Sequence, residues 1–219
     1  GSLVDVIPVL NHSKEELVIL SDCHMVNSLD YDALIKAHVD SGADVPMVCR
    51  HGAVPKLTDI PVLTMDASGH VTDLLLGRIA DQNAYYGIGV YVMRKDWLLR
   101  TITEAAARNL YHFERDILQR RKEELKICGY VVPSLVMPIY STASYFNANL
   151  ALLECEVREQ LFPMNRPVYT KLKDCDPVQY GLHAEVSNTL VGDGAHIDGK
   201  VKNCIIFRGA TVSRNAELE

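Results

Sequence analysis

The stretch Val186–Leu218, VSNTLVGDGAHIDGKVKNCIIFRGATVSRNAEL, carries apolar residues at a spacing that neither a helix nor an alternating strand explains. Val191 and Ile197 are six residues apart, and the same interval separates Ile206 from Val212. Such six-residue repeats are typical of a left-handed parallel β-helix, in which three faces make one coil and each face points an aliphatic side chain inward. The stretch therefore predicts about two coils. Short antiparallel strands joined by glycine turns remain the alternative.

The repeat slips in register between Ile197 and Ile206, where residues 198–201 are expected to form a corner or a small insertion. Stacked coils leave sheet edges open at both ends unless a cap covers them. The pattern runs on to Glu219 without such a cap, so we expect the natural sequence to continue. Gly1 and Ser2 are interpreted as a remnant of expression.

The composition is that of a globular protein: 219 residues, 48% hydrophobic, 23% charged, with a net charge of -6. This acidity disfavours nucleic acid and anionic membranes as partners, because both attract basic surfaces. The six cysteines are scattered without a CxxC pair, which favours reduced thiols and a cytoplasmic location over a disulfide framework or a zinc site. The expected divisions are an α/β domain over 3–161, a linker over 162–181 and the start of a β-helix over 182–219.

A compact apolar run, Leu17–Leu20, ends in Ser21-Asp22 and predicts a strand buried on both faces, as in a parallel sheet covered by helices. Asp30 is a suitable N-cap for the helix that follows, and Gly42 a suitable stop. A second strand is expected over residues 44–49. Strand, helix and strand within about thirty residues predict one βαβ unit.

The remaining pattern predicts a hairpin, further strands and three helices, of which the last is long and followed by a proline-containing linker. Two glycines in AYYGIGVYVM are expected to mark a bulge or a close approach of the backbone. The expected ranges are a hairpin over 60–73, strands over 84–93, 127–132 and 136–140, and helices over 97–109, from His112, and over 144–161 with Leu150, Leu153 and Val157 buried.

Two aspartates are the candidate site residues. Asp22 follows a strand, where α/β sheets bind ligands and where a carboxylate can hold a divalent cation beside a phosphate. Asp116, in HFERDI, could share the same ion. A turn-capping role for Asp22 and a helix-surface position for Asp116 remain alternatives. The chain contains no GxSxG, Walker or GxGxxG motif that would specify a nucleophile or a phosphate-binding loop.

Taken together, these features resemble the sugar-nucleotide pyrophosphorylases, and among them the glucose-1-phosphate adenylyltransferase (ADP-glucose pyrophosphorylase) family. The matches keep the family's order along nearly the whole chain, and SDCH is similar to its Gly-Asp-His motif. The segments that carry the resemblance are LVILSDCHMVNSLDY (17–31), KAHVDSGADV (36–45), IGVYVM (88–93), HFERDI (112–117), SYFNANLALLE (144–154) and VKNCIIFRGATV (201–212).

The resemblance implies a nucleotide-diphospho-sugar transferase (GT-A-like) mixed sheet followed by a left-handed β-helix. It also implies that Asp22 and Asp116 are magnesium ligands. The family's Glu-Lys-Pro segment, whose lysine holds the sugar phosphate, is replaced by residues 74–78, LLLGR, where Arg78 could supply a cation of different geometry. The family's Trp-Arg-Asp-Val-Gly-Thr is replaced by residues 137–142, MPIYST, and its amino-terminal glycine-rich loop has no counterpart.

With these departures, the chain resembles the D-type (GlgD-type) subunit of the family. This resemblance implies a regulatory, catalytically weak chain in a hetero-oligomer with a catalytic subunit. The implied reaction of the assembly joins ATP and glucose 1-phosphate into ADP-glucose with release of pyrophosphate, assisted by Mg²⁺. One alternative is an active sugar-phosphate nucleotidyltransferase in which Arg78 performs the lysine's role. Another is a hexapeptide-repeat scaffold or acyltransferase, which leaves the α/β part unexplained.

Overall fold

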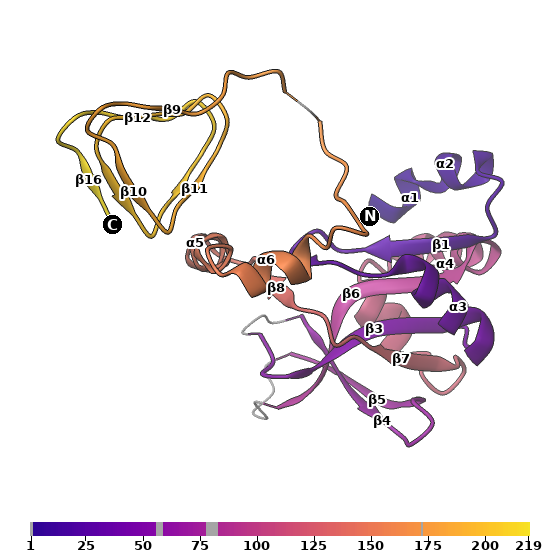
Figure 1. The fold of residues 1–219 in the computed structure, drawn as a ribbon. Helices are drawn as coiled ribbons and strands as arrows, with labels where there is room; N and C mark the ends of the chain where they lie inside the picture. Colours follow the sequence, from indigo (N-terminus) through magenta and orange to yellow (C-terminus); the bar gives the residue numbers. More distant parts are fainter. Residues whose placement is uncertain (1, 56–58, 78–82, 172) are drawn as a thin grey trace. The chain divides into compact units, whose positions relative to one another are not determined.

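The structure is a computed structural model that describes residues 2–55, 59–77, 83–171 and 173–219 (Figure 1). The chain forms two compact units, which are described separately. The first holds Gly1–Met25 and Leu29–Val136, and the second holds Val26–Ser28 and Met137–Glu219. None of the described helices is long and apolar enough to cross a membrane.

The first unit is built on a mixed sheet of six strands in the order β5-β4-β6-β3-β7, with β1 also paired to β6. Strands β1, β3 and β4 run antiparallel to β6, and β3 runs parallel to β7. The expected α/β class with a mixed sheet is confirmed. The strands are β1 (Leu17–Ser21), β3 (Val45–Gly52), β4 (Pro61–Met65), β5 (Val71–Leu76), β6 (Ala84–Arg94) and β7 (Ile127–Val131).

The central strand is β6, which separates the two strands of the predicted βαβ unit. Because β1 and β3 both pair antiparallel with β6, they run parallel to each other without being neighbours. Residues 86–93 of β6 are all buried, which explains why this later apolar segment takes the central place. The connecting helix α3 (Tyr31–Ser41) has the expected cap, since Ala33 N–H donates to Asp30 Oδ1 at 3.0 Å.

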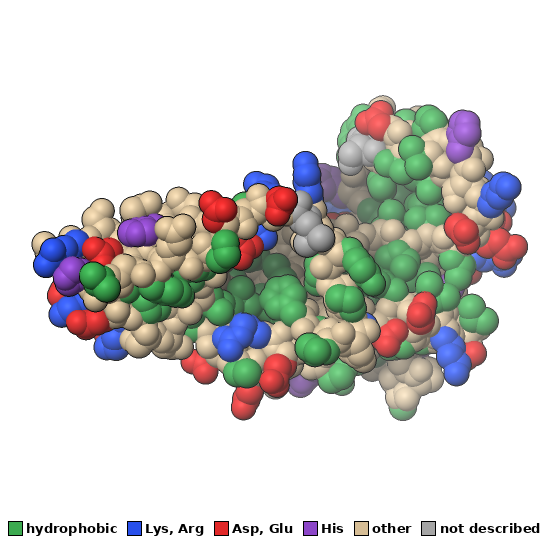
Figure 2. All heavy atoms as spheres, turned by 45° about the horizontal axis from the view of Figure 1, so that its top comes forward, with side chains coloured by type: hydrophobic (Ala, Val, Ile, Leu, Met, Phe, Trp, Pro, Cys, Tyr) green, Lys and Arg blue, Asp and Glu red, His purple; other side chains and the backbone are tan. Residues whose placement is uncertain are grey.

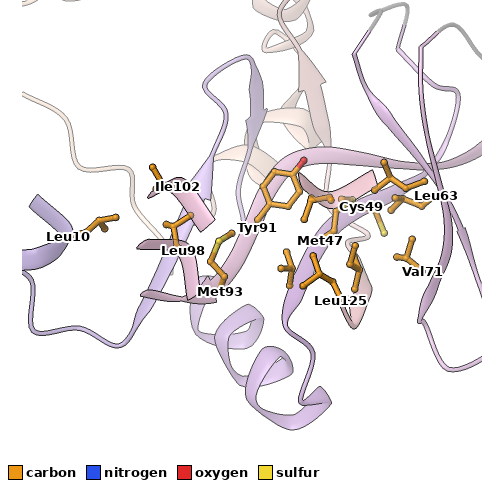
Figure 3. Packing of buried hydrophobic residues seen from close by; sticks show 14 residues of the cluster. Leu10, Met47, Cys49, Leu63, Val71, Tyr91, Met93, Leu98, Ile102 and Leu125 are labelled. Atoms are coloured by element: carbon orange, nitrogen blue, oxygen red, sulfur yellow. The ribbon is translucent and has the colours of Figure 1, made fainter. Parts of the chain in front are cut away.

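Helices cover both faces of the sheet, and each face has its own core. One core joins the sheet to α4 (Lys95–Ala107) through Leu98 and Ile102, and it extends to Leu10 of α2 (Ile7–His12) (Figure 3). The short helices α1 (Ser2–Asp5) and α2 were not predicted from the sequence. The opposite core contains Leu34 of α3 packed with Ile88, Val90 and other residues of β6.

The expected helix after His112 is a π-helix, η1 (Phe113–Gln119), and side chains of η1 and of the turn after it bond to the outer strand β5. Gln119 Nε2 donates to the Leu74 carbonyl at 3.0 Å, and Lys122 Nζ donates to Asp73 Oδ1 at 2.6 Å. Single π-helical turns are often found at functional sites.

The expected long helix over 144–161 is wrong as one element. The segment forms two helices, α5 (Thr142–Ala151) and α6 (Cys155–Leu161), separated by a turn. Arg158 of α6 donates through Nη1 to the carbonyls of Leu152 and Leu153 in this turn. Satisfying these terminal carbonyls with a guanidinium lets the helix stop there. The three side chains expected to be buried, Leu150, Leu153 and Val157, are only partly buried.

The carboxyl-terminal part of the second unit is a stack of short strands, all paired in parallel (Figure 1). They form three sheets, in the orders β10-β13-β16, β11-β14 and β15-β12-β9, and the chain visits the sheets in turn. The parallel pairing contradicts the alternative of antiparallel strands. The strands are β9 (Gln179–Tyr180), β10 (Glu185–Ser187), β11 (Leu190–Val191), β12 (His196–Ile197), β13 (Lys200–Lys202), β14 (Ile205–Ile206), β15 (Thr211–Val212) and β16 (Glu217–Leu218).

The stack repeats at shorter intervals than three hexapeptides would give. Lys200 pairs with Glu185, fifteen residues earlier, and with Glu217, seventeen residues later. The expected shift in the six-residue repeat corresponds to a corner at Asp198–Gly199. Strand β13 begins directly after this corner, and its residue Val201 points into the core of the stack. A Cβ on Gly199 would lie 2.5 Å from the Ala216 carbonyl oxygen, so this corner packs too closely against the next layer for any residue larger than glycine.

Opposite charges alternate along the outer surface of one of these sheets. Lys200 Nζ lies 3.3 Å from Glu217 Oε1. The hydrogen bond to Glu217 is the main cause that raises the pKa of Lys200, and the negative charge of Glu185, on the neighbouring strand, raises it further. Lys202 pairs with Glu219 in the same way. The remaining strands among the described residues, β2 (Met25–Asn27) and β8 (Val136–Pro138), form a smaller sheet.

One buried histidine makes the stability of the first unit depend on pH. His38 of α3 is 5% exposed, and its Nδ1 atom has no hydrogen-bond partner in the structure. Burial lowers the pKa of His38, the positive charge of Arg94 lowers it further, and Asp44 opposes both. The folded chain therefore holds this imidazole neutral under conditions in which the unfolded chain would take up a proton.

We predict that the free energy of unfolding falls as the pH drops below about 6.5, the ordinary histidine pKa, and levels off below the lowered pKa of the folded state. The variant His38→Leu should show a shallower decrease between about pH 7 and pH 5. Urea unfolding at a series of pH values measures this, with His12→Leu as an exposed control. An unchanged slope in His38→Leu would contradict the prediction.

Candidate functional site

Asp22 lies where β1 ends, against a bulge in β6. Its backbone N–H donates to the Gly89 carbonyl at 2.9 Å, and the register of β6 against β3 shifts between Val48 and Cys49. Gly89 has a φ of 71°, and a Cβ there would lie 2.2 Å from Asp22 Oδ2. The expectation that a glycine in this strand marks a bulge and a close approach is confirmed, and the close approach is to the candidate aspartate.

The Asp22 carboxylate is partly open to solvent, with 47% of its side chain exposed. Burial of the remainder raises the pKa of Asp22, and His24, whose Nδ1 is 3.9 Å from Oδ2, opposes this effect. This position allows the side chain to meet a ligand from solvent. Asp22 is thus placed as the sequence predicts, at the end of a strand in a mixed sheet.

A buried tyrosine connects the Asp22 region to η1. The hydroxyl of Tyr91 donates to Glu114 Oε1 at 2.9 Å, and its ring packs on Phe113 with centroids 5.4 Å apart. Burial raises the pKa of Tyr91 well above its ordinary value, and the negative charges of Glu114 and Asp22 add to this. Sequence reasoning missed Glu114, although an acidic residue two positions before Asp116 in the same helix was a usable signal.

Asp116 is buried, with 6% of its surface exposed, and both of its oxygens are engaged. Oδ2 accepts the backbone N–H groups of Tyr111 and His112, each at 3.1 Å. Oδ1 accepts from Arg115 Nε at 3.2 Å and lies 3.6 Å from Arg120 Nη2. These contacts lower the pKa of Asp116 to about 2, with the hydrogen bond from Arg115 as the largest cause. Asp116 therefore acts as an internal cap for the start of η1.

A cleft of about 560 Å³ opens beside Asp116, between α4 and η1. Three arginines line it, and three carboxylates balance them, so the cleft does not favour ligands of one charge. These charged residues are Arg108, Arg120, Arg121, Glu104, Asp116 and Glu124. The face shown in Figure 2 likewise carries interspersed acidic and basic side chains rather than a basic patch.

The contacts of the two aspartates bear on the predicted magnesium site. Magnesium binds carboxylate oxygens and keeps several waters, so a ligand needs a free, solvent-facing oxygen. Asp22 has one, whereas the oxygens of Asp116 are taken up by N–H donors. Among the described residues, no three His, Cys, Asp or Glu side chains gather as a metal site. The arrangement does not fit an ion shared by Asp22 and Asp116, and their role as ligands stays a prediction. Arg78 lies outside the described residues.

The contact between Asp22 and Gly89 predicts a specific pattern of stability. Gly89→Ala should lower the free energy of unfolding by about 2–4 kcal/mol, because it adds both backbone strain and a clash. Gly69→Ala is the control for strain alone: its φ is 82° and its nearest contact, the Gly129 carbonyl oxygen, is at 3.7 Å, so we expect about 1 kcal/mol.

The double variant Asp22→Gly/Gly89→Ala separates the two effects, since the three atoms nearest the added Cβ all belong to the Asp22 side chain. Relative to Asp22→Gly alone, Gly89→Ala should then cost no more than Gly69→Ala. Chemical unfolding of the wild type and the four variants measures this coupling. A full additive loss would show that the side chains do not meet.

Comparison with known proteins identifies homologues along almost the whole chain, although no protein-family model matches it. The chain is 24% identical over 215 residues to the "Glycogen biosynthesis protein GlgD" of Bacillus subtilis (strain 168), covering 98% of this chain and 53% of that protein. It is 26% identical over 206 residues to the protein of the same name from Geobacillus stearothermophilus, covering 93% and 50%.

The chain is also 22% identical over 214 residues to the "Glucose-1-phosphate adenylyltransferase" of Thermotoga neapolitana, covering 96% of this chain and 51% of that enzyme. It thus spans about half the length of these curated relatives. The homologues of this chain are GlgD proteins and glucose-1-phosphate adenylyltransferases, which confirms the family resemblance predicted from its sequence.

Proposed function

We propose that this chain is part of a regulatory, catalytically weak subunit of glucose-1-phosphate adenylyltransferase, acting in bacterial glycogen biosynthesis beside a catalytic subunit of the same family. The observation that carries the proposal is the state of Asp116, whose carboxylate accepts three N–H hydrogen bonds and lies 3.6 Å from Arg120 Nη2. The names of the relatives support the same pathway and reaction. ATP, glucose 1-phosphate and Mg²⁺ then belong to the assembly, with the catalytic subunit as the place of reaction.

The residues of this chain fit a supporting role better than a catalytic one. A reaction between two anionic substrates depends on cations and metal ions that offset the charge in the transition state. The lysine that the resemblance leads us to expect in residues 74–78 is replaced. Two of the three arginines of the α4–η1 cleft, Arg120 and Arg121, are paired with carboxylates. Glu114, which accepts a hydrogen bond from Tyr91, and Asp22 both place negative charge near this tyrosine.

We further propose that a left-handed β-helix begins with β9 at Gln179, three residues before the expected start at 182, because β9 pairs in parallel with β12 of the stack. Residues 3–161 then belong to a GT-A-like domain, with the residues from 162 up to β9 as the linker. Parallel stacking in three sheets with an apolar interior supports the first assignment. A stack of this kind offers its outer faces for contacts with other subunits. Effector response of the assembly would depend on such contacts.

The test is formation of ADP-glucose from ATP and glucose 1-phosphate with Mg²⁺, using the natural full-length protein alone and mixed with a catalytic subunit. We predict near silence alone, at most about a hundredth of the catalytic subunit's rate, and a changed rate or effector response in the mixture. Strong turnover by the protein alone would establish the active-enzyme alternative and make Arg78 the first residue to mutate. Strong activity after a single change to lysine within 74–78 would equally refute the regulatory proposal.

A second prediction concerns Asp116 as an internal cap. The pKa of Asp116 is lowered to about 2 in the folded chain. Its ionised carboxylate therefore contributes fully to the free energy of unfolding at pH values above the ordinary aspartate pKa near 4, and this contribution is lost as the pH falls towards 2. Asp116→Asn should lower the urea midpoint at neutral pH and flatten this acid loss. The exposed Asp40→Asn on α3 is the control. Equal destabilisation by both variants, or a Mg²⁺-dependent stabilisation that only Asp116→Asn abolishes, would contradict the cap.

A further inference from the structure

The charges of the α4–η1 cleft are balanced in number but unevenly shared. At one end Arg121 contacts two carboxylates: its Nη1 lies 3.7 Å from Glu104 Oε2, and its Nε lies 3.3 Å from Glu124 Oε2. One positive charge therefore faces two negative charges there. Because this leaves a surplus of one carboxylate, this end of the cleft favours a cation.

The opposite imbalance surrounds Asp116. Two guanidinium groups lie near its Oδ1 atom, that of Arg115 at 3.2 Å and that of Arg120 at 3.6 Å. Arg108 lies beside them, since the N–H of Tyr111, three residues further on, donates to Asp116 Oδ2. The Arg108 guanidinium makes no ion pair within the part of the chain that the structure describes. This end of the cleft therefore has a surplus of positive charge and favours an anion.

The two ends lie within reach of one small molecule. Glu104 and Arg108 are one turn apart on α4, a spacing that places their Cβ atoms about 6 Å apart on the same face of the helix. They form no ion pair with each other, because Glu104 pairs with Arg121. An ammonium group beside Glu104 and a carboxylate beside Arg108 are therefore separated by the short distance found in an α-amino acid.

Thr101 adds a buried polar group to the wall of the cleft. It is 4% exposed, and its hydroxyl makes no hydrogen bond among the described residues. Buried hydroxyls normally have a partner, and a threonine inside a helix commonly donates to the preceding turn. Thr101 lies one turn before Glu104 on α4, so a polar group bound at Glu104 would give this hydroxyl a partner.

An apolar pocket of about 60 Å³ adjoins the cleft. Ala105, Leu110 and Ile117 line both spaces, and Leu3 and Phe113 contribute to the apolar wall of the pocket. Its volume is about that of two water molecules at ~30 Å³ each, which suits a small aliphatic side chain. A ligand held by its charges in the cleft can thus place an apolar group in this pocket.

We propose that the α4–η1 cleft binds a small apolar α-amino acid in its zwitterionic form. The ammonium group donates to Glu104 and Glu124. The carboxylate accepts from Arg108 and Arg120, and the aliphatic side chain enters the apolar pocket. A ligand that brings both charges keeps the balance of the cleft, whereas a ligand with one charge disturbs it. Binding requires neither the catalytic subunit nor its substrates, so the site goes beyond the proposed function.

The test titrates L-valine into the isotope-labelled chain and follows the amide signals of Thr101, Leu110 and Ile117 by NMR. We predict saturable shifts at these amides. Isovalerate lacks the ammonium group and isobutylamine lacks the carboxylate, and each should bind at least about tenfold more weakly than valine. Glycine, which lacks the aliphatic group, should also bind about tenfold more weakly.

Arg108→Gln supplies the matched test on the protein side, because its guanidinium makes no ion pair that the substitution would break. It should weaken valine binding at least about tenfold and leave thermal unfolding unchanged. Arg100→Gln, which removes an exposed ion pair with Asp96 elsewhere on α4, is the control and should bind valine normally.

Three results would overturn the proposal. The first is the absence of saturable shifts up to the solubility limit of valine. The second is equal binding of valine and either singly charged analogue, which would show a site for one charge only. The third is unchanged valine binding in Arg108→Gln.

Discussion

Everything in the first unit depends on β6, a strand of eleven residues that must be paired along both edges and covered on both faces. Strand β3 takes one edge, while β1 and β4 share the other in succession. The bulge at Gly89 is the point between β1 and β4, and Asp22 fills the space that a side chain on that glycine would need. The candidate carboxylate is therefore placed by the same irregularity that lets β6 serve two strands on one edge.

Sequence reasoning was most successful where a signal is local. The Asp30 cap, the Gly42 stop and the β4–β5 hairpin follow from residue types within a few positions, and all appear in the structure. The order of strands could not be predicted in the same way, since continuous apolarity does not show which strand is the neighbour. It predicted burial correctly for β6, but β1, expected to be buried on both faces, is only partly buried over Leu17–Leu20. The break between α5 and α6 was missed because it depends on a contact of Arg158 with carbonyls beyond the reach of periodicity.

The candidate site shows the same division between composition and contact. The sequence identifies both aspartates, but they are chemically different: Asp22 is half-exposed with a raised pKa, whereas Asp116 is enclosed by N–H donors with a pKa of about 2. The difference in pKa between the two aspartates comes from their burial and hydrogen-bond partners, which residue type alone does not predict. The role of Glu114 follows from its hydrogen bond to Tyr91, which lies 23 residues earlier in the chain, although its place two residues before Asp116 was a local signal.

The alternating charges of Glu185, Lys200 and Glu217 have a consequence for how the stack assembles. Each strand of that sheet has neighbours of opposite sign, so moving a strand by one layer would bring like charges face to face. An uncharged column, such as the hydrogen-bonded Asn188 and Asn203 on the adjoining corner, makes no such distinction. The charged face thus disfavours misthreaded layers during folding, whereas the apolar interior, with similar aliphatic side chains in every layer, would tolerate them.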